Sequence, residues 1–438
     1  MNISPKPNRS TRNALAGPRT SIELPQAPLD CDYGIDGLAY IFEKIAGSRA
    51  NTNAIINSTV SAGRSYVIGE SYNPQTSEAK VFVACLKDLG TLDNSFGDGG
   101  IFDFNKAAST DYMDPKSIVE DAAGNLLIAL KVVGQSASHL WKLSAGGQPD
   151  PNFGDRKGYV DTRNLIGEEL VLEHLAVTKG HIFATGGKSE NFEPVVLGLD
   201  NDGALRADFG DDGLVDVSKL IPDTDSHIVD GIASFTSPSN AQQLVLTWYL
   251  IRGEDPYSVT TAMTPDGKVD DNFGTKGFHW SAPWIINNGF SVDPVAKRIT
   301  FYGELYDVDE DISHPTVYRI DYSGAPAREF NGGEALVFDK PGGWYAGVET
   351  AGGLVGYGHF YTYSLAFSLT SEGTFDTRFV PPFGYGQFGA QIPEDGFYAS
   401  GSTVSLDAGN QRLLINGRDE EVRGSTVPCV AAVALPSA

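Results

Sequence analysis

The sequence has 438 residues, of which 50 are glycine, 24 are proline and only three are methionine. This composition is typical of many short strands joined by tight turns, and it argues against long helices. The formal net charge of −24 argues against nucleic acid as a partner, because an acidic protein repels the phosphate backbone.

The first 26 residues are rich in Pro, Arg, Asn and Ser, and we expect them to form a flexible basic arm. They contain no apolar stretch of the kind that a secretory signal needs, so we expect a protein that is cytoplasmic or exported by a non-classical route. No apolar run in the whole sequence reaches the length of a membrane span. The three cysteines lie far apart, which argues against a disulfide framework.

A short phrase recurs along the rest of the chain, at steps of about 60 residues. Its clearest copies are LDNSFGDGG at 92–100, PNFGDRKG at 151–158, ADFGDDG at 207–213 and DNFGTKG at 271–277. Each copy centres on an aromatic anchor, and weaker copies extend the series in both directions. The seven anchors are Tyr33, Phe96, Phe153, Phe209, Phe273, Phe330 and Phe379.

The segments between anchors repeat one pattern: a short strand after the phrase, then a β-hairpin, then a further strand that leads into the next phrase. Four antiparallel strands per unit, repeated radially, predict an all-β protein with a seven-bladed β-propeller over residues 27–438. We expect each blade to be continuous in sequence, with the short strand innermost. Six or eight blades, or a β-solenoid, remain as alternatives.

The residues of the phrase suit a structural role. A glycine stands six residues before most anchors, where a tight turn needs a left-handed backbone. An aspartate stands three residues before most anchors, where it can accept a hydrogen bond from the backbone two residues on. We expect the anchor itself to be buried between blades, so the phrase is architecture rather than a site.

The phrase G-x-L-D-x-x-F-G-x-x-G resembles the delta-60 repeat, a repeat of bacterial β-propellers. The resemblance covers roughly residues 27–438, and the units of Phe330 and Phe379 depart from the pattern. It implies a propeller fold that often occurs in secreted or surface-associated proteins. It implies no fixed activity, so it assigns no catalytic residues.

Carboxylates offer the main candidates for metal binding. Asp103, Asp161 and Asp216 occupy one place on the short strand of three consecutive units, where they would bind a cation beside the central channel. The alternative is that each begins a turn that faces solvent. The acidic segment 307–313, DVDEDIS, resembles part of a calcium loop but lacks its distal glutamate, so weak Ca²⁺ binding is the most that it indicates. No other cofactor is expected.

The variable loops collect aromatic residues on the face opposite the phrase. Loops on a rigid scaffold often carry recognition, and exposed aromatics suit sugars or protein partners. We therefore expect a non-enzymatic protein that binds a carbohydrate or a protein partner through this face. One alternative is a hydrolase or lyase with a site at the mouth of the central channel. Another is a structural subunit of a secreted or toxin-like assembly. The alternative is that these aromatics seal the rim under long loops. The candidate ligand-binding residues are Tyr257, Trp280, Trp284, Trp344, Tyr345, His359 and Tyr361.

Overall fold

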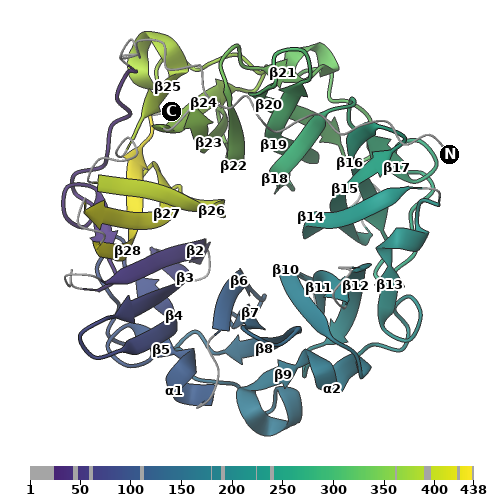
Figure 1. Ribbon diagram of the computed structural model, residues 1–438. Helices are drawn as coiled ribbons and strands as arrows, with labels where there is room; N and C mark the ends of the chain where they lie inside the picture. Colours follow the sequence, from purple (N-terminus) through teal and green to yellow (C-terminus); the bar gives the residue numbers. More distant parts are fainter. Residues whose placement is uncertain are drawn as a thin grey trace, which may run out of the picture.

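The computed structural model describes residues 24–42, 48–58, 63–108, 113–178, 180–188, 193–222, 224–236, 241–360, 363–388, 396–421 and 425–436. These residues form a ring of antiparallel β-sheets around a central axis (Figure 1). The expected class, an all-β propeller with four-stranded antiparallel blades, is confirmed. Residues 24–26, expected in the flexible arm, instead run along β25, where the amide of Gln387 donates to the carbonyl of Pro25.

The strands of the described residues group into sets of four. Five sets are separate sheets, and the sixth sheet has eight strands that divide into β6–β9 and β10–β13. Only one residue pair, Leu170 with Ala137, joins these two halves, so we treat each half as a blade. The first two strands of each blade, counted from the axis, are β2 (Arg49–Ser58) and β3 (Arg64–Asn73), β6 (Met113–Glu120) and β7 (Leu126–Val132), β10 (Leu170–Thr178) and β11 (His181–Lys188), β14 (Asp225–Thr236) and β15 (Gln242–Arg252), β18 (Ile285–Asp293) and β19 (Arg298–Asp307), β22 (Gly342–Thr350) and β23 (Gly353–Phe360), and β26 (Gly396–Asp407) and β27 (Arg412–Glu421).

The short strand that follows each phrase lies at the rim, not at the axis (Figure 1). The phrase reverses the chain, so the short strand pairs with the strand before the phrase as the second arm of a hairpin. The expected innermost position of the short strand is therefore wrong. The third and fourth strands of the blades are β4 (Glu78–Leu86) and β5 (Ile101–Asp103), β8 (Ala137–Leu143) and β9 (Tyr159–Asp161), β12 (Glu193–Asp200) and β13 (Leu214–Asp216), β16 (Asp255–Met263) and β17 (Phe278–Trp280), β20 (Ile312–Asp321) and β21 (Leu336–Val337), β24 (Tyr363–Thr370) and β25 (Tyr385–Gln387), and β28 (Ser425–Ala434) and β1 (Leu38–Tyr40).

The last blade takes its outer strand from the other end of the chain. Strand β1 pairs antiparallel with β28, with Ala39 opposite Val430. The expectation that no blade borrows a strand is wrong, because the chain ends on a third strand and leaves its edge unpaired until β1 covers it. The closure is extended by hydrogen bonds from Asp30 to Ala432 and from Ala434 to Pro28.

The phrase joins neighbouring blades. All seven anchors are buried, with exposed fractions of 2% or less. At six junctions of the described chain, the backbone N–H after an anchor donates to a carbonyl in the turn of the next phrase, over 2.6 to 3.0 Å. This contact explains why the phrase recurs once per blade. The donor and acceptor pairs are Gly34 and Leu89, Gly97 and Gly146, Gly154 and Asp202, Gly210 and Asp266, Gly274 and Ser323, and Asn331 and Glu372.

The glycine and the aspartate of the phrase have the expected roles. Gly147 has a φ of 74°, and a Cβ there would come within 3.0 Å of the Phe96 ring of the preceding phrase. The aspartate accepts from the amide two residues on, as in Asp150 with Asn152 over 2.9 Å. The same bond is present at Asp30, Asp93, Asp270 and Asp376.

A buried arginine reinforces the closure of the ring. The Arg412 side chain is 1% exposed and contacts both ends of the chain. Its Nη1 donates to Asp30 over 2.9 Å, its Nε donates to Asp407 over 2.9 Å, and its guanidinium lies 4.8 Å from the centre of the Tyr33 ring. The guanidinium also donates to the carbonyl of Asp88. One cation thus holds the N-terminal segment, the last blade and the first blade together.

We expect Arg412→Met to lower the free energy of unfolding by about 3–5 kcal/mol, because it leaves two carboxylates near the core without their cation. The matched control is Arg378→Met, which removes an arginine whose side chain is 57% exposed beside Asp376 and should cost about 1 kcal/mol or less. Urea denaturation of both variants measures the difference. Equal losses would show that the buried arginine has no special part in closing the ring.

Candidate functional site

Every innermost strand carries a β-bulge. The register between the first and second strands shifts once in six blades and twice in β14. A bulge redirects a side chain and is common beside active sites. We define the bulge ring as the extra residues at these shifts, with only the second shift of β14 included: Asn53, Lys116, Glu173, Asp230, Asn288, Tyr345 and residues 400–403.

Buried serines hold two of the bulges in place. The amide of Leu172, just before the bulge in β10, donates to Ser138 of the preceding blade over 2.9 Å. The amide of Asn287 donates to Ser258 in the same way, also over 2.9 Å. Both serines are fully buried. Each hydroxyl therefore satisfies a backbone group and ties the bulge to its neighbour.

The first polar cluster joins blades two and three. Lys116 Nζ lies 3.2 Å from Asp114 Oδ2 and 3.3 Å from Glu173 Oε2. Burial raises the pKa of Glu173, although the nearby Lys116 opposes this shift. Burial alone would lower the pKa of Lys116, but Glu173 and Asp114 raise it, so the ammonium group stays charged.

Asp230 stands apart because nothing in the described chain neutralises it. Its Oδ2 is buried and has no hydrogen-bond partner among the described residues, although part of the residue is accessible. Burial raises the pKa of Asp230 well above its usual value. The adjacent Val229 forms a backbone hydrogen bond with His174, and burial lowers the pKa of His174 to about 4. A neutral imidazole is thus expected at pH 7, and Asp230 keeps its proton to a higher pH than an ordinary aspartate does.

The second polar cluster joins blades five and six, and it contains two of the residues expected from the sequence. Tyr345 stacks on His359, with ring centres 5.1 Å apart. Burial lowers the pKa of His359, whose Nδ1 is buried without a hydrogen-bond partner. Burial raises the pKa of Glu304, and it also raises the pKa of Tyr345, to which Glu304 adds. Asn288 of the bulge ring donates to the carbonyl of Trp344 over 3.1 Å.

The other expected aromatics do not join this cluster. Tyr257 and Trp280 pack edge to face on β16 and β17 in the outer half of blade four. Trp284 packs on Tyr306, with ring centres 5.7 Å apart. Tyr361 lies outside the described residues. The continuous aromatic face expected from the sequence is therefore wrong, because the short strands and the loops after them begin at the rim.

Trp344 is a core residue. It is 2% exposed and packs on Phe367, with ring centres 4.3 Å apart. Its expected role as a ligand-binding residue is wrong, because its side chain is buried in a hydrophobic cluster formed by blades five and six. The bulge lies directly after Trp344, at Tyr345, and it turns only Tyr345 away from this packing.

The three aspartates expected beside the channel lie at the rim instead. Asp161 accepts from the amide of Arg163 at the start of α2 (Thr162–Ile166) over 3.0 Å. Asp103 accepts from Lys106 in α1 (Phe104–Ala108), and Asp216 accepts from Ser218. They are caps of short turns on the outer strands of three different blades. The expected shared cation site is therefore wrong.

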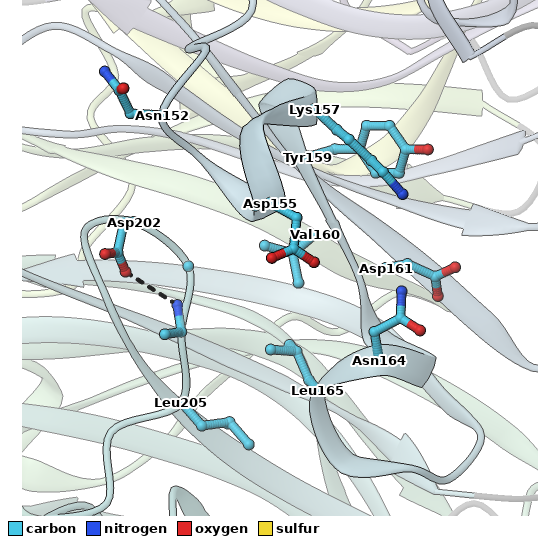
Figure 2. Close-up of a pocket in the computed structure, with 13 residues that line it drawn as sticks. Asn152, Asp155, Lys157, Tyr159, Val160, Asp161, Asn164, Leu165, Asp202 and Leu205 are labelled. Atoms are coloured by element: carbon cyan, nitrogen blue, oxygen red, sulfur yellow. Dashed lines mark hydrogen bonds between the residues drawn. The ribbon is translucent and has the colours of Figure 1, made fainter.

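A polar cavity of about 350 Å³ lies at the rim (Figure 2). It forms because the phrase of Phe153 has one residue more than its neighbours, and Asp155 and Arg156 take left-handed conformations there. Figure 2 shows Asp155 and Lys157 on one wall and Leu205 on the other, with Asp202 bonded to the amide of Ala204. None of the buried unpaired polar atoms of the described chain belongs to this lining. The bulge ring, which contains such an atom, is therefore the stronger candidate.

No family model matches this chain, and no curated protein matches it. The resemblance to the delta-60 repeat thus stays a prediction. Within the described residues, no helix is long and apolar enough to cross a membrane.

Solved structures of similar shape include three from proteases and peptidases. The propeller domain of the Trilobed protease from Pyrococcus furiosus is 8% identical, with a TM-score of 0.46, and the match covers 87% of this chain and 94% of that one. Prolyl oligopeptidase B from Galerina marginata is 11% identical, with a TM-score of 0.42, and 89% and 51% are covered. The Pyrococcus horikoshii acylaminoacyl peptidase is 8% identical, with a TM-score of 0.43, and 84% and 49% are covered.

This chain spans about half the length of these two peptidases. At such low identity the likeness describes the propeller fold, and what the peptidases act on is a property of those proteins. The expectation of a non-enzymatic binding protein finds no support in these structures, which come from hydrolytic enzymes.

We expect Trp344→Ala to lower the free energy of unfolding by roughly 3–5 kcal/mol, because it leaves a large cavity in the core. Trp284→Ala should cost about 1 kcal/mol, since it removes one ring contact at a partly exposed site. Thermal and urea unfolding of the two variants give the comparison. A Trp344→Ala protein as stable as wild type would contradict the packing described for blade six.

The raised pKa of Asp230 predicts a pH dependence of stability. The folded protein binds this proton more tightly than the unfolded chain, so the stabilisation is complete below the unfolded value of 3.8 and is lost as the pH rises through the folded pKa. Asp230→Asn lacks this titration, and its melting temperature should therefore rise relative to wild type as the pH increases. The control is Asp98→Asn, which changes an exposed carboxylate. A constant difference between wild type and Asp230→Asn from pH 4 to 8 would contradict the assignment.

Proposed function

We propose that this chain is a hydrolase whose site is the bulge ring, with Asp230 as the proton donor. The observation that carries the proposal is the Asp230 carboxyl group, which has a buried oxygen without a hydrogen-bond partner among the described residues and a raised pKa. A carboxyl group whose pKa is raised holds a proton that it can pass to a leaving group, as general acid catalysis requires.

Glu173 supplies the second carboxyl group of the proposed pair. It occupies the bulge of β10, next to the bulge of β14 that holds Asp230. Lys116 lies 3.3 Å from Glu173 and favours its ionised form, whereas Asp230 has no such cation. Burial raises the pKa of both carboxyl groups, but a cation opposes the shift only at Glu173, so Asp230 suits the acid and Glu173 the base or charge-stabilising group.

The charge of the ring limits the substrate. Even without the protonated Asp230, three carboxyl groups in or beside the ring outnumber its one cation: Asp114, Glu173 and Glu304 against Lys116, which is already paired with Asp114 and Glu173. An anionic substrate would be repelled and would find no free cation among these groups. The proposal therefore favours a neutral or cationic substrate.

The test is turnover of chromogenic ester, peptide and glycoside substrates that carry no negative charge. Asp230→Asn should reduce kcat by about 10²-fold or more, the range lost when a general acid is removed. Asp98→Asn, which changes an exposed rim carboxylate, should keep wild-type turnover. No turnover by wild-type protein across the panel, or full activity of Asp230→Asn, would contradict the proposal.

A reaction in ¹⁸O-labelled water separates hydrolysis from elimination. Hydrolysis places one oxygen from water in a product, so mass spectrometry should find the label. An unlabelled, unsaturated product would mean a lyase and would overturn the proposed reaction.

A further inference from the structure

We propose that the turn between β19 and β20 is a binding site for a divalent transition metal ion such as Zn²⁺, with Asp307, Glu310 and His314 as ligands. This group is the one set of three such residues in the described chain whose ligand atoms lie within 4.8 Å of one another. It lies outside the bulge ring, and it does not depend on the proposed hydrolase activity.

The strand register brings the ligands together. Asp307 pairs with Ile312, and Leu305 pairs with His314. Asp307 and His314 are therefore diagonal neighbours on one face of the hairpin, because residues two apart in a strand share a face. Glu310 comes from the turn between the two strands and completes the group from the end of the hairpin.

Backbone contacts fix the first ligand before any ion arrives. Asp307 Oδ1 accepts from the amides of Asp309 and Glu310 over 2.9 and 3.2 Å. The neighbouring Asp311 is engaged by the hydroxyl of Tyr306 over 2.5 Å. The turn thus holds the carboxylate of Asp307 in position, and the nearest competing carboxylate, that of Asp311, is already hydrogen-bonded to Tyr306.

The charge of the turn also favours a cation. Four acidic residues lie within five positions of this turn: Asp307, Asp309, Glu310 and Asp311. No lysine or arginine of the described chain forms an ion pair with Asp307 or Glu310. A bound divalent ion would relieve the repulsion among these carboxylates.

The donor set selects the kind of metal. Two carboxylates and one imidazole suit Zn²⁺ and similar ions, whose ligands lie about 2.0–2.2 Å from the metal. Ca²⁺ takes about six to eight oxygen ligands and gains little from an imidazole. Asp307 and His314 are partly buried and Glu310 is exposed, so water completes the coordination.

Calorimetric titration of metal-free protein with ZnCl₂ tests the site. Wild type should bind one ion, and His314→Ala and Glu310→Gln should each weaken binding by at least about tenfold, the smallest loss expected for a direct ligand. Asp309→Asn is the matched control, since it removes the same charge from the same turn without removing a ligand. Circular dichroism and the melting temperature establish that each variant is folded.

A second measurement distinguishes a ligand from general attraction by acidic residues. Titration with Co²⁺ should give visible d–d absorption bands that are lost in His314→Ala and kept in Asp309→Asn. Equal weakening by Asp309→Asn and His314→Ala, or binding of Ca²⁺ more tightly than Zn²⁺, would overturn the proposal. So would the absence of saturable Zn²⁺ binding in wild type.

Discussion

The pairing of β1 with β28 is the constraint on which the ring depends. A row of blades that is not closed has two end faces, and each exposes apolar side chains that a neighbouring blade would otherwise cover. The three-residue strand Leu38–Tyr40 covers the edge of the last blade, and the buried Arg412 fixes the segment before it through Asp30. Closure therefore combines backbone pairing, one ion pair and the burial of Tyr33 in a single place.

Within the closed ring, the phrase and the inner strands have different roles. The phrase supplies an anchor and a backbone hydrogen bond at each of six junctions, and it stays nearly the same because every junction has the same shape. The inner strands share only the position of their bulge, and the residue there changes from Lys116 to Glu173, Asp230, Asn288 and Tyr345. A constant frame with variable residues at one level is the arrangement that lets a propeller carry chemistry.

The frame of the propeller can be predicted from the sequence, but the bulge ring cannot. The blade class, the buried anchors and the aspartate turns follow from local rules about glycine, aspartate and strand length, which act within a few residues. The radial order of the strands does not follow from such rules, because a short strand after a turn can pair with the strand before it or start the next blade. Because each short strand pairs with the strand before it, Asp103, Asp161 and Asp216 lie at the rim and not at the axis.

The bulge ring left almost no signal in the sequence. Lys116 follows a proline, Glu173 follows a leucine and Tyr345 follows a tryptophan, so no residue type marks the shift. The bulge appears only when two strands are paired, since it is a mismatch of register between them. Tyr345 and His359 were found from their aromatic surroundings, whereas Asp230 was missed because a lone aspartate beside a glycine suggests a turn.

Hydrogen exchange of β1 tests the closed ring most directly. Mass spectrometry of exchanged peptides measures Leu38–Tyr40 separately from β28 and from the exposed turns. We expect the amides of β1 to exchange as slowly as those of β28, because the two strands open together. Exchange of β1 within seconds, while β26, β27 and β28 stay protected, would show that the last blade stands without its borrowed strand and would contradict the closure described here.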